Sequence, residues 1–124
     1  MYCASFLVAQ ATARALVEDG ASDAFFVITG SSGEGEEDLA CAEYIAALVG
    51  NPNTASEPYL QLARSSYAAA ILGQRASDGV PGVHPLDVET CLSANVFDFV
   101  MRAEFEPVGE DRLLTLRAYN QGNA

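Results

Sequence analysis

The chain has 124 residues, which is enough for one domain with a real core and too few for two. Half of the residues are hydrophobic, so the composition excludes a disordered chain. No apolar run approaches the ~20 residues that a membrane span needs. The formal net charge of −11 excludes nucleic acid as a partner, because contact with phosphates requires a basic face.

The cysteines indicate the compartment. Cys3, Cys41 and Cys91 lie far apart, are odd in number and do not have the spacing of a metal site. This favours reduced thiols, and the first residues lack the basic and apolar regions of a signal peptide. The expected location is therefore the cytoplasm, with no membrane partner.

The first two elements are predicted to be a helix and a buried strand. Apolar residues recur at helical spacing from Cys3 to Val17, and Gly20 ends the pattern. The run Ala24–Thr29 is apolar without alternation, which is typical of a strand covered on both faces, as in a parallel sheet.

Three further helices are predicted in the middle of the chain. One spans about 36–49 and ends at Gly50, and Ser56 begins another that extends to Ile71. Glycine and proline make 76–85 a loop. The short helix after this loop is expected to face inward with Val88, Cys91 and Leu92.

The end of the chain predicts an antiparallel hairpin with one strongly apolar face. Residues 96–103 and 113–119 alternate, and 106–111 form the turn. The residues expected on the apolar face are Phe97, Phe99, Met101 and Ala103 in the first strand and Leu114, Leu116 and Ala118 in the second.

These elements predict a single α/β domain over residues 1–124, or the C-terminal part of a larger protein. The expected architecture is α/β/α layers with a partial sheet, composed of one buried parallel-type strand and the hairpin, with about four helices. A doubly covered parallel strand needs parallel neighbours, and no other segment has that pattern. The missing strands are expected from a second copy in a homo-oligomer or from a longer chain.

The connection between the predicted strand and the next helix is rich in glycine and carboxylates. Backbone N–H groups and the positive end of the helix dipole converge at such a turn and attract anions. Here the four carboxylates of Glu34, Glu36, Glu37 and Asp38 would repel an anion unless a divalent cation accompanied it, and magnesium suits such ligands. The alternative is that acidic residues in a first helical turn only complement the helix dipole.

Other residues near this loop suit an anionic ligand. Gly33 and Gly35 allow backbone amides to approach a phosphate. Ser31 and Ser32 can donate hydrogen bonds to the same oxygens. Arg64 can pair with a sulfonate or carboxylate, with a plain surface arginine as the alternative.

Several segments together resemble a known family. They are Ala4–Ala11, the glycine-rich loop, Glu37–Ala42 with the pattern Glu-Asp-x-x-Cys-Ala, Asp87–Leu92 and Val96–Val100. In order and spacing these segments are similar to the 2-phosphosulfolactate phosphatase family. The resemblance extends from about Ala4 to Ala118 and corresponds to the second half of the usual family member. This chain departs from the family pattern at Asn95, where a second aspartate is expected.

The resemblance implies a magnesium-dependent phosphatase that hydrolyses a small phosphorylated (sulfo)lactate-type acid, in the pathway to coenzyme M. It implies Glu37 and Asp38 as metal ligands, and Asp38 and Asp98 as catalytic residues. The ligand is then a small anionic phosphate ester, and the isolated chain is expected to have weak activity or none.

Two other functions stay open at this point. One is a non-catalytic α/β assembly module whose sheet is completed by a partner or a second copy. The other is an acidic module that binds a nucleotide or another anion together with magnesium. Asp98 also has an alternative interpretation, as an exposed residue on a half-covered hairpin.

Overall fold

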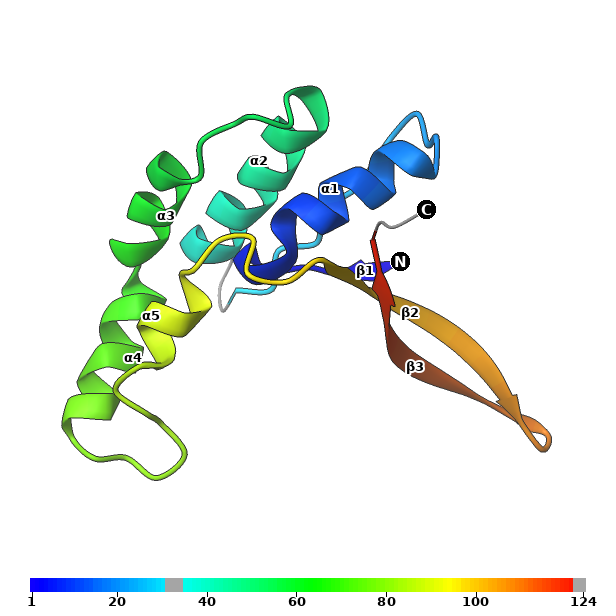
Figure 1. Ribbon diagram of the computed structural model, residues 1–124. Helices are drawn as coiled ribbons and strands as arrows, with labels where there is room; N and C mark the ends of the chain where they lie inside the picture. Colours follow the sequence, from blue (N-terminus) through cyan, green and yellow to red (C-terminus); the bar gives the residue numbers. More distant parts are fainter. Residues whose placement is uncertain (31–34, 122–124) are drawn as a thin grey trace.

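The computed structural model describes residues 1–30 and 35–121 and has a mixed helix and strand fold (Figure 1). The predicted α/β class is confirmed at this level. The elements are β1 (Tyr2–Cys3), the 3-10 helix η1 (Phe6–Val8), α1 (Ala9–Glu18), α2 (Glu36–Gly50), α3 (Glu57–Arg64), α4 (Tyr67–Ser77), α5 (Asp87–Cys91), β2 (Phe99–Val108) and β3 (Asp111–Asn120). None of the described helices is both long and apolar enough to cross a membrane.

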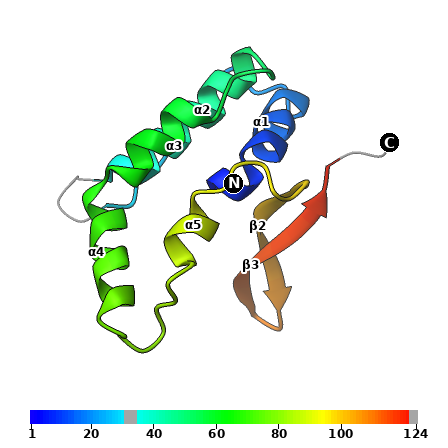
Figure 2. The same ribbon diagram turned by 60° about the vertical axis from the view of Figure 1, so that its left-hand side comes forward.

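The main core lies among α1, α2 and α3, which pack side by side (Figure 2). Ala9 and Ala13 let α1 approach α2 closely, because each presents only a methyl group. The ring of Tyr44 stacks between two other rings, with centroids 6.1 Å from Phe6 and 5.3 Å from Tyr59. The stripes predicted from spacing for the first two helices therefore do form the core, together with Leu60 and Ala63 of α3, whereas Tyr67 of the third predicted stripe is exposed.

Asn95 joins three parts of this core. Its backbone N–H donates to the carbonyl of Phe6 at 2.9 Å. Its side-chain oxygen accepts from the N–H of Gln10, and its amide nitrogen donates to the hydroxyl of Tyr44, both at 2.9 Å. The backbone of Asn95 has φ of 57°, a left-handed conformation that asparagine tolerates better than most residues.

The sheet is antiparallel and has the order β1–β2–β3. It meets the helices through Val100, which is buried against Ala11 and Ala15 of α1. On the same face as Val100, Arg102 donates to the hydroxyl of Tyr2 at 2.8 Å. The face that packs on α1 is thus partly polar.

The opposite face of the hairpin is apolar and exposed. The strand register places Met101 beside Ala118, Ala103 beside Leu116 and Phe105 beside Leu114. Phe105, Leu114 and Leu116 are between 52% and 61% exposed. The predicted apolar face exists, but the expectation that it forms the core is wrong. Phe97, predicted on the apolar face, is 49% exposed, and Val100 of the other face is buried instead.

The predicted buried strand over Ala24–Thr29 is absent from the described fold. These residues form no strand, and no backbone–backbone hydrogen bond within the described part of the chain involves residues 21–28. Phe25 and Val27 are 93% and 85% exposed. The physical reason is the lack of a neighbour, because a strand exists only when another strand pairs with it.

Two predicted boundaries also differ. The helix expected from Ser56 to Ile71 is divided into α3 and α4. Ser66 causes the division, because its buried hydroxyl accepts from the N–H of Ala69 at 3.2 Å and caps a new helix. The hairpin strands reach Val108 and resume at Asp111, so its turn is shorter than the predicted 106–111.

We expect Asn95→Ala to lower the free energy of unfolding by about 2 kcal/mol, because it removes two hydrogen bonds and places alanine in a left-handed conformation. Asn95→Asp keeps an oxygen for Gln10 and an acceptor for Tyr44, so it should lose less than half of that amount. Chemical denaturation followed by circular dichroism measures both. Val96→Ala, at an exposed neighbour, is the control. Equal stability of all three variants would contradict the role of Asn95.

Candidate functional site

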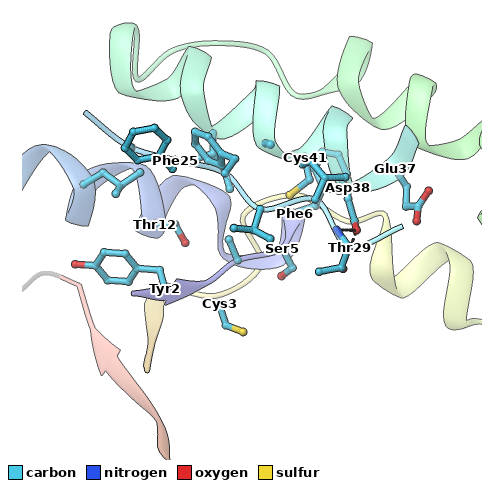
Figure 3. Close-up of a pocket in the computed structure, with 18 of the residues that line it drawn as sticks. Tyr2, Cys3, Ser5, Phe6, Thr12, Phe25, Thr29, Glu37, Asp38 and Cys41 are labelled. Atoms are coloured by element: carbon cyan, nitrogen blue, oxygen red, sulfur yellow. Dashed lines mark hydrogen bonds between the residues drawn. The ribbon is translucent and has the colours of Figure 1, made fainter. Parts of the chain in front are cut away.

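A cavity of about 620 Å³ lies between the start of the chain and the extended segment 23–29 (Figure 3). One wall consists of Met1–Phe6, including β1, and the other consists of Asp23–Thr29. The floor comes from the helices, with Thr12 and Leu16 of α1, Cys41, Ala42 and Ile45 of α2, and Cys91 and Leu92 at the end of α5. Its volume is typical of ligand-binding pockets.

The first turn of α2 places two carboxylates in this cavity. Glu37 and Asp38 both line it and are half-buried. The carboxylate of Asp38 accepts hydrogen bonds from the backbone N–H and the hydroxyl of Thr29, at 3.2 and 3.1 Å. These bonds fix the orientation of Asp38 and attach segment 23–29 to α2 (Figure 3).

Gly35 is required by the close approach of this segment to α2. A β-carbon at position 35 would lie only 2.6 Å from a methyl carbon of Ile28. Gly35 is buried and directly precedes α2. Sequence reasoning assigned Gly35 to phosphate binding, and in the structure its lack of a side chain also allows the wall of the cavity to pack.

The two predicted magnesium ligands, Glu37 and Asp38, are neighbours in the first turn of α2. Magnesium is usually held by one or two carboxylates and keeps waters that substrate oxygens replace. Glu37 and Asp38 can supply those two ligands. Within residues 1–30 and 35–121 no group of three His, Cys, Asp or Glu side chains is arranged around a common point for a metal ion.

The other predicted site residues are not brought to this cavity. Asp98 forms an ion pair with Arg14, and both side chains are about half exposed. Arg64 pairs with Glu57 at 2.8 Å and borders a separate hollow beside α4. Neither lines the cavity of Glu37 and Asp38. Ser31, Ser32, Gly33 and Glu34 lie outside the described residues.

Cys41 packs against the helical core and also lies in the cavity floor. Burial, with a smaller contribution from the charge of Asp38, raises the pKa of its thiol to about 12. Cys91, expected to face inward, is exposed. The walls themselves were missed by sequence reasoning, because Met1–Phe6 carries no motif of a binding site.

Comparison of the chain with family models, with curated proteins and with solved structures finds no match.

The raised pKa of Cys41 predicts selective labelling of the thiols. Below pH 12 the Cys41 thiol stays protonated, and only the thiolate reacts readily. With iodoacetamide at pH 8, we expect Cys3 and Cys91, which are exposed, to react at least about tenfold faster than Cys41. Mass spectrometry of the digested protein measures the three rates.

Asp38→Asn is the matched variant for this prediction. It removes the smaller cause of the raised pKa and leaves the burial, so Cys41 should stay slow. In guanidinium chloride the three thiols should react at similar rates. Fast labelling of Cys41 in the native protein would contradict the assigned environment.

Proposed function

We propose that this chain contributes to a magnesium-dependent phosphatase site that takes a small phosphorylated (sulfo)lactate-type acid. The observation that carries the proposal is that Glu37 and Asp38, at the N-terminal end of α2, both line one cavity. The sequence resemblance to the 2-phosphosulfolactate phosphatases supports the choice of reaction. Its Glu-Asp-x-x-Cys-Ala pattern contains both carboxylates and Cys41 of the cavity floor.

Glu37 and Asp38 are the residues that would hold the metal. When bound, magnesium neutralises phosphate charge and can activate a water for in-line attack. Thr29 holds Asp38 through two hydrogen bonds, so this carboxylate would lose little conformational freedom when it binds a cation. The N-terminal end of α2 adds a favourable field for the phosphate oxygens.

The chain by itself has only part of such a site. Asp98 and Arg64, proposed for catalysis and substrate binding, are engaged in ion pairs outside the cavity. Within residues 1–30 and 35–121, no arginine or histidine lines the cavity to offset the charge of a phosphorylated acid. We therefore expect hydrolysis by the isolated chain to be weak or absent, while magnesium binding at Glu37 and Asp38 is retained.

Magnesium titration of the wild-type chain by isothermal calorimetry tests the proposal. Asp38→Asn keeps an oxygen for Thr29 and removes the charge, so we expect it to weaken binding by at least about tenfold. Glu36→Gln is the control, because Glu36 is exposed in the same helical turn and does not line the cavity. No saturable response of the wild-type chain, or equal losses in both variants, would refute the proposal.

A second candidate function is a non-catalytic assembly module, and the uncovered hairpin favours it. Phe105, Leu114 and Leu116 form an apolar face on which each of the three side chains is more than half exposed. Exposed apolar faces of this kind are typical of protein–protein contacts. In this interpretation the second helical layer of the expected α/β/α architecture would come from another copy or another protein.

Sedimentation velocity tests the assembly function through two neighbouring leucines. Leu114 lies on the apolar face, whereas Leu113 faces the other side, beside Glu106, and is equally exposed. If the apolar face mediates self-association, Leu114→Lys should raise the dissociation constant of the assembly by at least about tenfold. Leu113→Lys should leave this constant unchanged. A wild-type chain that stays monomeric at high concentration would contradict self-association through this face.

A further inference from the structure

Two backbone segments, each with an edge that no described strand pairs with, line the same cavity. β1 pairs with β2 along one edge, and it is the outermost strand of the described sheet, so its other edge is free. Across the cavity, the backbone of residues 21–28 makes no hydrogen bond to another described backbone group. Figure 3 shows Tyr2 and Cys3 on one side of the cavity and the segment with Phe25 and Thr29 on the other.

The space between these edges has the properties of a strand site. Its floor is mostly apolar, with Leu16, Ala42, Ile45 and Leu92 among the lining residues. Segment 24–28 would extend about 16 Å as a strand, at ~3.3 Å per residue. An extended peptide of that length can satisfy free backbone groups on both walls, which a small ligand cannot do.

The charge of the cavity indicates the chemistry of the strand. Among the described residues that line it, the charged side chains are those of Asp23, Glu37 and Asp38, and all three are acidic. A strand with basic residues beside its apolar stretch would complement them, whereas an acidic strand would be repelled. The overall charge of −11 acts in the same direction.

We propose that this cavity binds an extended, apolar β-strand with basic flanking residues, supplied by another polypeptide. The strand pairs through its backbone with β1 on one side and with residues 24–28 on the other, and places alternate apolar side chains on the floor formed by α1 and α2. This inference goes beyond the proposed function, because it depends on the free backbone edges and requires no metal.

The probe is an acetylated and amidated seven-residue peptide in which valine and threonine alternate between two terminal arginines. Binding is followed by fluorescence anisotropy of the labelled peptide, in EDTA, so that a failure of magnesium binding does not affect the result. Hydrogen exchange of the full chain is measured in parallel. We expect saturable binding and at least tenfold slower exchange of amides within residues 24–28. The absence of either would overturn the proposal.

Modified peptides test the two-sided pairing and the charge. N-methylation of alternate residues blocks one edge of a strand, and two such peptides block opposite edges. Each should bind at least tenfold more weakly, because both edges of the strand are paired in the cavity. Exchanging the arginines for glutamates should have a similar effect. Unchanged affinity of any of the three peptides would overturn the corresponding part of the proposal.

Proline variants of the chain provide a control within the protein. Ala24 and Val27 are both exposed, so proline at either position removes an N–H without disturbing the core. Consecutive N–H groups of an extended chain point to opposite edges, so only one of Ala24→Pro and Val27→Pro removes a donor facing the cavity. That variant should lose at least tenfold in peptide affinity relative to the other, and equal affinities would contradict pairing with this segment.

A second copy of the chain is the competing occupant. A stable dimer, detected by sedimentation, in which the amides of 24–28 are already protected without peptide would overturn the proposal. In that case the strand partner would be this chain itself. A monomer with fast exchange at the same amides, slowed by the peptide, supports the assignment to another polypeptide.

Discussion

The arrangement of the domain depends on the three hydrogen bonds of Asn95. They attach the segment before β2 to Phe6, to the start of α1 and to the buried hydroxyl of Tyr44 in α2. β2 begins four residues further on, at Phe99, and passes beside α1. Val100 is therefore buried, and the more apolar face, with Phe105 and Leu114, points away from the helices. The described fold thus keeps these long-range polar contacts while the larger apolar surface stays exposed.

Much of the helical core and the C-terminal hairpin could be predicted, whereas the strand β1 and the face of the hairpin that is buried could not. The helix over 36–49 was found almost to the residue, because its apolar spacing and Gly50 are local signals. The division of the predicted helix at Ser66 was missed, because a serine between two apolar stripes can equally well lie in the interior of one continuous helix. The burial of Val100 instead of Phe97 depends on the tertiary contact of Asn95, which no periodicity reveals.

The candidate site was predicted only as far as local sequence determines it. Glu37 and Asp38 share a cavity because they are neighbours in one helical turn. Asp98 and Arg64 were expected beside them, but Arg14 and Glu57 are nearer partners of opposite charge. The apolar run 24–29 indicates that its side chains would be stable in a buried strand. The run does not indicate whether the fold supplies a neighbouring strand, and Phe25 and Val27 are exposed.

The two proposals place different cations at the same carboxylates. Magnesium bound at Glu37 and Asp38 would reduce the negative charge of that end of the cavity. A basic residue of an inserted strand would reduce it in the same way. If both bind, each weakens the other electrostatically unless a phosphate group joins them, and linkage requires the two effects to be equal in free energy. If a phosphate ester also bound, the negative carboxylates, the positive magnesium and the negative phosphate would alternate in sign. The basic residue of the strand would then be attracted to the phosphate. Strand insertion would in that case supply the positive charge that the cavity of this chain lacks.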